Sequence, residues 1–595
     1  MNDKIYLQIR DKVFKVKKDV LCEHSDYFRA MFSGNYVENE QKQICIDMLD
    51  PNTMHIILQY MQIGLIDLSE YTLSTIKEIT IAANFLQITE LIKQIEYTLD
   101  IGTCASNWME TMDIAEISCF PKLEKFCVAF GLFSFKSMKP EYVLNIHKLA
   151  WYLSHPYLDS QSELEVFNFG LEWIFHTETG ADALLVIIGC LDMKKVSTQD
   201  LEEIKKCMKG FENSLAAKVI DLLYDLSVNN LDLSETILNK QKSELCEKFT
   251  QRVWTETLDI IKESKTRCLQ YTPVIPLWLL KDGKPELLPH SMYTYYHGRG
   301  FEQWLEVADK NLWGWSVVAW GLTKLVIVCG EHGRGTGMFM RDVKVYDTLR
   351  KEWTRHGVNL PQRRHAGLAV IGDSLYIAGG VGGFRVVLDT AIVYDLKQRS
   401  FRKISQMPDA LQNPALCSHN NKVYAAGQKS IYCHEDTGTS DFWRKVVDTE
   451  MRMSCIRSCK EYIYCIQGYF SNLYRFMPGV EKNLQLITYF SSLPVTAVLF
   501  TNFFNTDFKI FFFFSGEILY IFTWTICGQC DVLTVEEFKA KRTVEKPKVL
   551  FTQSDNCMRV NDVAGSCSLV MSAPPLYKEL SKYHKRYLAR YPDPV

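Results

Sequence analysis

The sequence predicts a multidomain fold with three parts in series: an α/β domain, an all-α domain and an all-β propeller of six blades. Three observations lead to this prediction. Residues 1–100 mix short alternating strands with amphipathic helices. Residues 101–265 have helical periodicity and almost no strand alternation, and from residue 268 onward short apolar strands recur, each ending near a glycine.

Composition and charge indicate which kinds of partner the protein binds and in which cellular compartment it acts. The 67 basic and 70 acidic residues leave a net charge of −3, so the chain offers no overall positive field to nucleic acid or to an anionic membrane. The opening residues lack the apolar core of a secretory signal, and the 19 cysteines are scattered rather than arranged as a disulfide framework. We therefore expect a cytoplasmic protein, with a nuclear location left open, and neither nucleic acid nor membrane as a partner.

The α/β domain is predicted from a run of short elements. Residues 5–9 and 13–16 alternate as strands, residues 19–32 form a helix that Asp19 caps, and residues 44–46 form a third strand. Asp50 and Pro51 begin a further helix that ends at Gly64. Two more helices are expected around residues 73–86 and 89–99.

Residues 26–34, with the sequence DYFRAMFSG, resemble the signature of the BTB/POZ domains found in kelch-like proteins. The resemblance implies a BTB domain over residues 1–100. In that family a hydrophobic–x–Glu triplet after this helix contacts a cullin scaffold, and the matching residues here are Tyr36, Val37 and Glu38. An aromatic anchor beside a charge suits a protein-binding surface, and the alternative is a solvated loop in which Tyr36 packs on its own domain.

Three departures from the family pattern leave cullin binding and self-association open. The chain begins at the first strand, without the preceding helix and strand that the family exchanges between partners, so we expect weak or absent homodimerisation. Lys4 and Lys17 stand where the family often has an Asp and a His, and Gln62, Ile63 and Gly64 stand where it has Tyr-Thr-Gly.

The middle segment, residues 101–265, is predicted to be an all-helical arm. Leu164, Phe167, Leu171 and Ile174 recur at steps of three and four residues, as on the buried face of a helix. Residues 163–174 resemble a helix of the BACK domain, which implies an all-α BACK domain over residues 101–265. In the family its first helices extend the cullin contact of the BTB domain.

The last half carries a degenerate repeat with a period of about 40 to 50 residues, the spacing of propeller blades. Tyr346 is followed by Trp353, and Tyr394 by Phe401, at the positions where the kelch repeat has a Tyr and a later aromatic. The resemblance to the kelch repeat implies a six-bladed kelch-type propeller over residues 268–595. The glycines that end the repeated strands are Gly283, Gly330, Gly380, Gly427, Gly468 and Gly516.

Loops that follow these glycines are predicted to emerge on one face of the propeller, because the blades repeat around an axis. They carry arginines and aromatic residues, the types enriched at binding hot spots. We expect this face to bind a short acidic segment of a substrate protein, although a solvated loop remains the alternative for Arg334. The candidate substrate-binding residues are Arg334, Phe384, Arg385, Tyr469 and Phe470.

No motif for catalysis or for a cofactor is present. The sequence lacks the zinc-protease, P-loop, nucleophile-elbow and dinucleotide motifs, and Cys527 and Cys530 form a lone Cys-x-x-Cys without a second ligand pair. A copper oxidase built on such a propeller would need a Tyr/His/Cys cluster that we cannot assemble. The basic stretch at residues 576–591 is predicted to be a solvated face. We expect no enzyme, no cofactor and no metal.

The order BTB, BACK and kelch implies a function. It is the architecture of substrate-recognition adaptors of cullin–RING E3 ubiquitin ligases, with the BTB domain on the cullin and the propeller on a substrate protein. The alternative is a non-ligase scaffold or an actin-associated cytoskeletal protein, since the altered BTB positions would suit a chain that has lost its cullin.

Overall fold

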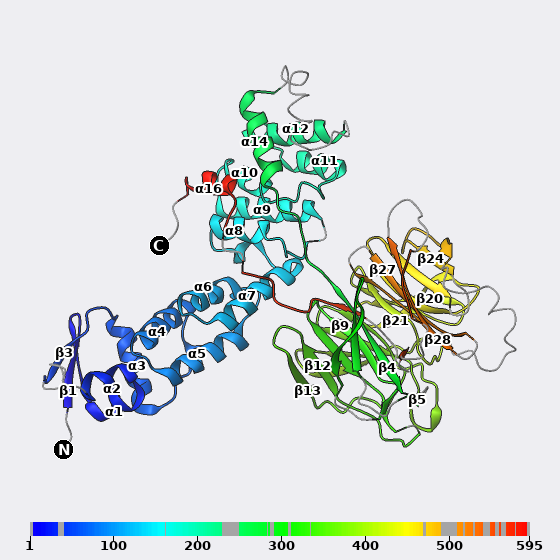
Figure 1. The fold of residues 1–595 in the computed structure, drawn as a ribbon, viewed down its shortest axis with the longest axis horizontal. Coiled ribbons are helices and arrows are strands. Elements are labelled where there is room, and N and C mark those ends of the chain that lie inside the picture. Colours follow the sequence, from blue (N-terminus) through cyan, green and yellow to red (C-terminus); the bar gives the residue numbers. More distant parts are fainter. Residues whose placement is uncertain are drawn as a thin grey trace. The chain divides into compact units, whose positions relative to one another are not determined.

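The computed structural model describes residues 4–33, 41–160, 162–228, 249–281, 284–285, 291–307, 311–333, 335–467, 472–489, 509–515, 518–527, 530–539, 548–553, 558–560, 567–576 and 579–591. The chain forms two compact units (Figure 1). The first contains residues 1–269 together with 573–595, and the second contains residues 270–572. The chain therefore passes from the first unit to the second after Leu269 and returns after Ser572.

The N-terminal part of the first unit is the predicted α/β domain. Its three-stranded sheet has the order β2-β1-β3, with β1 antiparallel to β2 and parallel to β3. The domain contains β1 (Lys4–Ile9), β2 (Lys12–Lys17), α1 (Lys18–His24), α2 (Asp26–Ser33), β3 (Gln43–Cys45), α3 (Pro51–Ile63), η2 (Leu68–Glu70), α4 (Leu73–Phe85) and α5 (Thr89–Gly102).

Helix α3 begins and ends as its sequence predicts. The Asp50 carboxylate accepts hydrogen bonds from the backbone N–H groups of Asn52 and Thr53, at 2.8 and 3.1 Å, and Pro51 fills the first turn. Gly64 closes the helix in the left-handed conformation, with φ of 80°.

The single helix predicted over residues 19–32 is instead two helices, α1 and α2. Ser25 is extended between them, and its hydroxyl donates to the carbonyl of Leu86 and accepts from the N–H of Phe28 at 3.2 Å. A serine that caps the next turn in this way competes with helix continuation, which explains the break.

The rest of the first unit is helical, as predicted for residues 101–265. The predicted apolar face of helix α9 (Glu163–Thr177) is buried, since Phe167 and Ile174 lie in the core. The Ser162 hydroxyl caps this helix. No helix among the described residues is both long enough and apolar enough to span a bilayer. The elements are α6 (Trp108–Ile117), α7 (Pro121–Phe133), η3 (Phe135–Ser137), η4 (Pro140–Tyr142), α8 (Ile146–Ser154), α9 (Glu163–Thr177), α10 (Ala183–Ile188), α11 (Thr198–Cys207), α12 (Leu215–Val228), α14 (Gln251–Glu263) and, from the chain end, α16 (Lys582–Leu588).

Helix α16 corrects two expectations. The propeller was predicted to run to residue 595, but residues 573–595 belong to the first unit, where α16 packs against α8, α10 and α14. The basic stretch is not simply a solvated face, because Tyr583, His584, Tyr587 and Leu588 are buried on the helical unit. Its arginines meet acids there: Arg586 pairs with Glu256 and Asp259.

The second unit consists of antiparallel sheets arranged as propeller blades. Within the described residues the innermost strands contact one another in the order β9, β14, β18, β22, β26 and β31, and β31 contacts β9 again, so six sheets close a ring. Five of these sheets are β9 (Ser316–Trp320), β10 (Lys324–Val328), β12 (Val343–Asp347), β13 (Glu352–His356); β14 (Gly367–Ile371), β15 (Ser374–Ala378), β16 (Ala391–Asp395), β17 (Ser400–Ile404); β18 (Leu416–His419), β19 (Lys422–Ala426), β20 (Ser430–Asp436), β21 (Asp441–Asp448); β22 (Met453–Cys459), β23 (Tyr462–Gln467), β24 (Asn472–Phe476), β25 (Gln485–Tyr489); and β26 (Lys509–Ser515), β27 (Ile518–Cys527), β28 (Cys530–Lys539), β29 (Lys548–Gln553).

The remaining sheet is built from both ends of the second unit. Strand β31 pairs with β4 in the register Cys567 to Val274 and Leu569 to Thr272, so the end of the unit completes its first blade. This sheet contains β4 (Thr272–Lys281), β5 (Lys284–Pro285), β6 (Ser291–Tyr296), β7 (Gly300–Glu306), β30 (Met558–Val560) and β31 (Cys567–Leu569), and a separate pair joins β8 (Leu312–Trp313) to β11 (Glu331–His332).

One predicted repeat has the wrong phase. Gly516 is predicted to follow a strand equivalent to β10 and β15, but the strand before it, β26, is the innermost strand of its sheet. The second strand is β27, so the glycine that corresponds to Gly330 and Gly380 in this blade is Gly528 rather than Gly516. Both residues lie outside the described part of the chain.

Candidate protein-binding site

Most residues of the predicted binding sites lie outside the described residues. This holds for Tyr36, Val37 and Glu38 of the cullin triplet, and for Arg334, Tyr469 and Phe470 of the propeller face. Lys4 and Lys17 are described, and they lie exposed and directly opposite each other across β1 and β2.

The structure describes the other two predicted residues, Phe384 and Arg385, at the tip of a loop between β15 and β16. We call residues 381–388 the finger loop. Its base pairs with Arg364, whose N–H and carbonyl both bond the backbone of Val381, at 2.9 and 2.8 Å. Further backbone bonds join Gly382 to Val386 and Leu388 to Gly380, each at 2.9 Å. The loop is therefore fixed by its own backbone rather than by side-chain packing at its tip.

The tip presents apolar side chains to solvent. Phe384 is fully exposed, and Val386 and Val387 are exposed beside it. Phe384 and Arg385 both have left-handed backbone conformations, with φ of 52° and 60°. Each such residue other than glycine or asparagine costs about 1 kcal/mol, and strain of this kind concentrates at binding sites.

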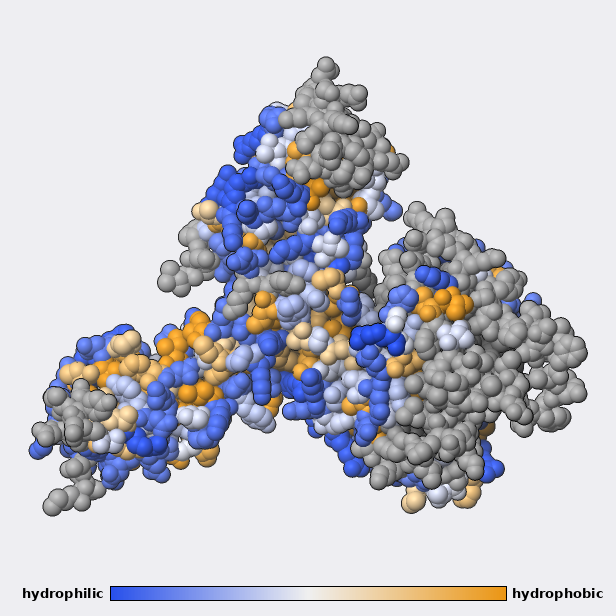
Figure 2. Space-filling view, viewed as in Figure 1, coloured by the Kyte–Doolittle hydropathy of each residue, from blue (hydrophilic) through white to orange (hydrophobic). Residues whose placement is uncertain are grey.

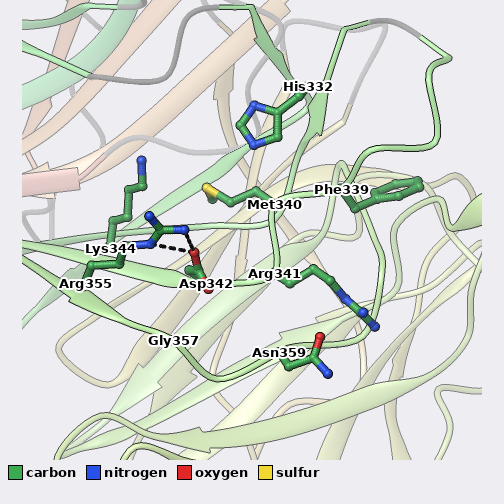
Figure 3. Close-up of a pocket in the computed structure, with 9 residues that line it drawn as sticks. All are labelled: His332, Phe339, Met340, Arg341, Asp342, Lys344, Arg355, Gly357 and Asn359. Atoms are coloured by element: carbon green, nitrogen blue, oxygen red, sulfur yellow. Dashed lines mark hydrogen bonds and ion pairs between the residues drawn. The ribbon is translucent and has the colours of Figure 1, made fainter.

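Strands β12 and β13 and the loops beside them line a cavity of about 460 Å³ (Figure 3). Lys344 of β12 and Arg355 of β13 stand on one side of it with Asp342, and Arg341 extends along the opposite side towards Asn359 (Figure 3). The remaining lining residues are His332, Phe339, Met340 and Gly357.

The charges of the cavity are predominantly positive. Lys344 and Arg355 are directly opposite in the β12–β13 register, a like-charge arrangement that destabilises a sheet. Asp342 pairs with Arg355, whose Nε lies 2.6 Å from the carboxylate. Arg341 donates from Nε to the carbonyl of Leu360 at 3.0 Å, which holds its guanidinium at the cavity. The cavity is therefore lined by three basic side chains, Arg341, Lys344 and Arg355, and by one acidic side chain, Asp342.

The connection from β13 to β14 joins the cavity to the finger loop. Its residues Gly357 and Asn359 line the cavity. Further along, Gln362 lies under the loop, since a Cβ built on Gly383 would stand 3.7 Å from the Gln362 side-chain oxygen. Arg364 then pairs with Val381 at the loop base. The cavity and the finger loop therefore share one wall.

A buried ion pair joins the loop that follows β10 to the connection between β13 and β14. The Arg364 guanidinium pairs with Glu331, whose side chain is only 2% exposed. Glu331 also accepts from the N–H of Gly337 at 2.8 Å and so orders the loop that carries His332, Phe339 and Met340. Burial by itself would raise the pKa of Glu331, but backbone N–H groups of Gly337 and Gly335 and the charge of Arg364 hold the pKa below its ordinary value.

The sequence predicts Phe384 and Arg385 of the finger loop as binding residues and does not predict the cavity. The signal was present in the hairpin around residues 347–352, where Lys344 and Arg355 stand equally far from the turn and so face each other. Two positive side chains directly opposite each other on neighbouring strands destabilise a sheet unless an acidic group lies beside them.

The first unit exposes apolar side chains where the α/β domain meets the helical region. Ile81 of α4 and Ile117 of α6 are exposed. The two helix ends are joined by a hydrogen bond from the Asn84 side chain to the carbonyl of Ser118, at 3.4 Å. Orange apolar surface gathers over the part of the unit where Figure 1 places these helices (Figure 2). We call Ile81 and Ile117 the seam patch.

Across the described ranges, no three His, Cys, Asp or Glu side chains converge as a metal ion requires. The buried thiol of Cys417 in the propeller is a poor nucleophile, because burial raises the pKa of Cys417 to about 12.

Comparison with known proteins identifies two of the three parts. The BTB/POZ domain family matches residues 4–101, and the Kelch motif matches residues 362–408, which include β14 to β17 and the finger loop.

Curated relatives extend the likeness over much of the chain. Kelch-like protein 26 of Danio rerio is 23% identical over 466 residues, covering 71% of this chain and 74% of that protein. Kelch-like protein 15 of Mus musculus is 30% identical over 179 residues, a match that spans only 29% of either protein. Kelch-like protein 40b of Danio rerio is 26% identical over 244 residues, covering 40% of this chain and 39% of its own length. The chain thus carries a BTB domain, a helical region and kelch-type blades in this order, and kelch-like proteins are among its homologues.

Proposed function

We propose that the chain is a substrate-recognition adaptor of a cullin–RING E3 ubiquitin ligase. The observation that carries the proposal is the presence, in one chain, of a BTB domain and a kelch-type propeller in two separate compact units. One unit is free to hold a scaffold while the other holds a substrate. The chain would contribute proximity, and ubiquitin transfer would belong to its partners.

Two features of the first unit support a cullin contact. Tyr36, Val37 and Glu38 match the family's docking triplet in sequence. The seam patch offers Ile81 and Ile117 as a second apolar surface where the BTB domain meets the helical region. We propose that this helical region, which resembles a BACK domain, continues the cullin-binding surface.

The propeller supports the substrate side of the proposal. The finger loop exposes Phe384 and two valines on a fixed backbone, and aromatic side chains of this kind act as anchors at protein interfaces. We further propose action in the cytoplasm or nucleus, and weak homodimerisation through the BTB domain.

The test is co-precipitation of a cullin with the full-length chain. Ile81→Glu combined with Ile117→Glu should weaken cullin binding at least ~10-fold, because a charge would be buried against an apolar partner. Tyr36→Ala combined with Glu38→Ala should have a similar effect. Val13→Glu, which changes an exposed valine on β2, serves as the matched control and should bind as the unchanged chain does.

Loss of cullin binding must be separated from loss of folding. Each variant should keep the circular dichroism and melting profile of the unchanged chain. A chain that binds no cullin while its propeller keeps a protein partner would instead be a scaffold or cytoskeletal protein. That outcome would overturn the ligase proposal.

A further inference from the structure

Helix α16 belongs to the first unit, although the chain reaches it from the second. Strand β31 is the last strand of the propeller, and α16 then packs against α8, α10 and α14 of the helical region (Figure 1). Its buried side chains are Tyr583, His584, Tyr587 and Leu588. A helix of 7 residues is too short to be stable by itself, so α16 depends on this docking.

The polar contacts of α16 fix it to α14, the helix from which the chain leaves for the propeller. The N–H of Tyr583 donates to the Glu263 carboxylate at 3.1 Å. Arg586 donates to Glu256 and Asp259, at 2.7 and 2.8 Å. These three acids all belong to α14. The outgoing and the returning chain are therefore held at the same helix.

The outgoing link between the units is short. The N–H of Cys268 donates to the carbonyl of Pro156 at 2.8 Å, which holds Cys268 on the first unit. Strand β4 of the propeller begins at Thr272. Residues 269–271 lie between these two points, in neither helix nor strand. The path from Cys268 to Thr272 can therefore span at most about 14 Å.

The returning link closes a ring with the outgoing one. At the propeller, Thr272 pairs with Leu569 in the register of β4 and β31, so the two links start side by side. At the helical region, α16 lies on α14, and the Lys265 ammonium donates to the carbonyl of Glu579 at 3.4 Å. The ring is closed as long as α16 is docked.

A closed ring restricts motion more strongly than a single link. With one link, the propeller can turn about two backbone dihedrals at each residue of that link. With both links joined, only those combinations of dihedrals remain that keep the ring closed. Pro574 and Pro575 fix φ at two positions of the returning link and restrict it further.

We propose that α16 is a latch: docked on the helical region, it restricts the orientations that the propeller can take relative to the first unit, and its undocking widens that range. The inference does not depend on the proposed function, because it concerns only the connection between the units. In an adaptor of the proposed kind, the latch would limit how far a bound substrate moves relative to the scaffold.

Single-molecule fluorescence energy transfer on the full-length chain tests the latch. Dyes are attached through unnatural amino acids at Val13 of β2 and Lys403 of β17, which are both exposed, so the native cysteines stay unchanged. An insert of about 20 Gly and Ser residues between Ser572 and Ala573 adds roughly 25 Å of reach to the returning link. The distribution of dye separations should become at least about twofold broader.

Hydrogen–deuterium exchange of residues 582–588 shows whether α16 is still docked in the insertion variant, where we expect protection to persist. A second variant, Tyr583→Ala combined with Tyr587→Ala, removes two buried rings and should undock the helix. It should broaden the distribution at least as much, while the propeller transition keeps its melting temperature.

Two matched controls separate the latch from other effects of the changes. The same insert after Gly438, in the exposed turn between β20 and β21, lengthens the chain without lengthening either link. Lys585→Ala changes an exposed side chain of α16 and leaves its buried side chains in place. Both proteins should keep the distribution width of the unchanged chain.

An unchanged width in the insertion variant would overturn the inference. If only the Tyr583→Ala, Tyr587→Ala variant broadens the distribution, α16 acts through the stability of the first unit and not as a latch. Equal broadening by the insert after Gly438 would likewise contradict the role of the returning link. Cullin co-precipitation by the insertion variant tests the proposed function separately, because the insert lies outside the BTB domain and the helical region.

Discussion

At Phe384 the backbone conformation and the exposed side chain favour different types of residue. The backbone φ of 52° favours glycine, whereas exposure of an aromatic ring favours a role in binding. Phe384→Gly should therefore stabilise the propeller by about 1 kcal/mol, because it removes the Cβ that is strained in this conformation. The melting temperature of the propeller transition, measured by calorimetry, is expected to rise by a few degrees.

Phe384→Ala is the matched variant, since it removes the ring but keeps the Cβ. Its stability should stay close to that of the unchanged chain. If alanine stabilises the propeller as much as glycine does, relief of backbone strain is not the cause.

Arg267 stabilises the helical region through a buried ion pair. Its guanidinium pairs with Glu163 in two hydrogen bonds of 3.0 Å, and both side chains are at most 3% exposed. The same guanidinium donates to the carbonyls of Leu153 and His155. This network fixes the end of the helical region just before the chain leaves for the propeller.

Arg267→Met should destabilise the first unit by about 3–5 kcal/mol, because it leaves the buried Glu163 carboxylate with the Asp192 N–H but without a positive charge to pair with. The double variant Glu163→Leu, Arg267→Met should recover a large part of that loss, since an apolar pair of similar size carries no unpaired charge. Urea denaturation of the full-length chain, followed by the helical circular-dichroism signal, which comes from the first unit, measures both. A double variant no more stable than the single one would contradict this explanation.

Pairs of this kind mark the limit of prediction from sequence at the residue scale. Glu163 was predicted to lie on a helix, which is correct, but nothing local indicates that it meets Arg267, 104 positions away. The same holds for Glu331 and Arg364, 33 positions apart, which join two loops of different blades. Local capping was predictable because Asp50 and its N–H donors are neighbours in the chain.

Helix α16 shows what sequence patterning predicts at the scale of an element. Its charges suggested a solvated face, but Tyr583, Tyr587 and Leu588 recur at helical spacing and are buried. The fit to the helical region is close, since a Cβ added at Gly189 would stand 2.6 Å from the Tyr583 ring. An amphipathic pattern is visible in seven residues, whereas the surface that receives it lies on α8, α10 and α14, far away in sequence.

Docking of α16 is expected to depend on pH through His584. Burial lowers the pKa of His584 to about 4, with Lys265 acting in the same direction and Glu263 and the carbonyl of Val186 opposing it. An undocked His584 would titrate near its ordinary pKa of 6.5, so the undocked state binds more protons between pH 6.5 and 4. The docked state therefore loses stability as the pH falls through this window, by at most about 1.4 kcal/mol per pH unit.

Hydrogen–deuterium exchange of residues 582–588, corrected for intrinsic rates, measures this effect on the full-length chain. Protection should fall by up to about tenfold per pH unit below 6.5. His584→Gln keeps a polar side chain that does not titrate and should flatten the dependence. Equal pH dependence in both proteins would assign the effect to another group.

The chain passes between the two units twice, after Leu269 and after Ser572. The second unit closes its ring through β31, and Val570 continues the closure by donating to the carbonyl of Leu322 and accepting from the Thr348 hydroxyl, each at 2.7 Å. Only then does the chain return after Ser572 to add α16 to the first unit. Each unit therefore depends on a different part of the last 35 or so residues.

Two truncations of the full-length chain separate these roles. A chain that ends after Ser572 keeps β31 and loses α16, so its first unit should melt at a lower temperature while the propeller transition is unchanged. A chain that ends after Val560 also loses β31, which leaves β26 and β9 without the innermost strand between them, and its propeller transition should disappear or fall by more than ten degrees. Differential scanning calorimetry resolves both transitions. A propeller that melts unchanged without residues 561–572 would show that β31 is not the closing strand, and a first unit unaffected by loss of residues 573–595 would show that α16 adds nothing to its stability.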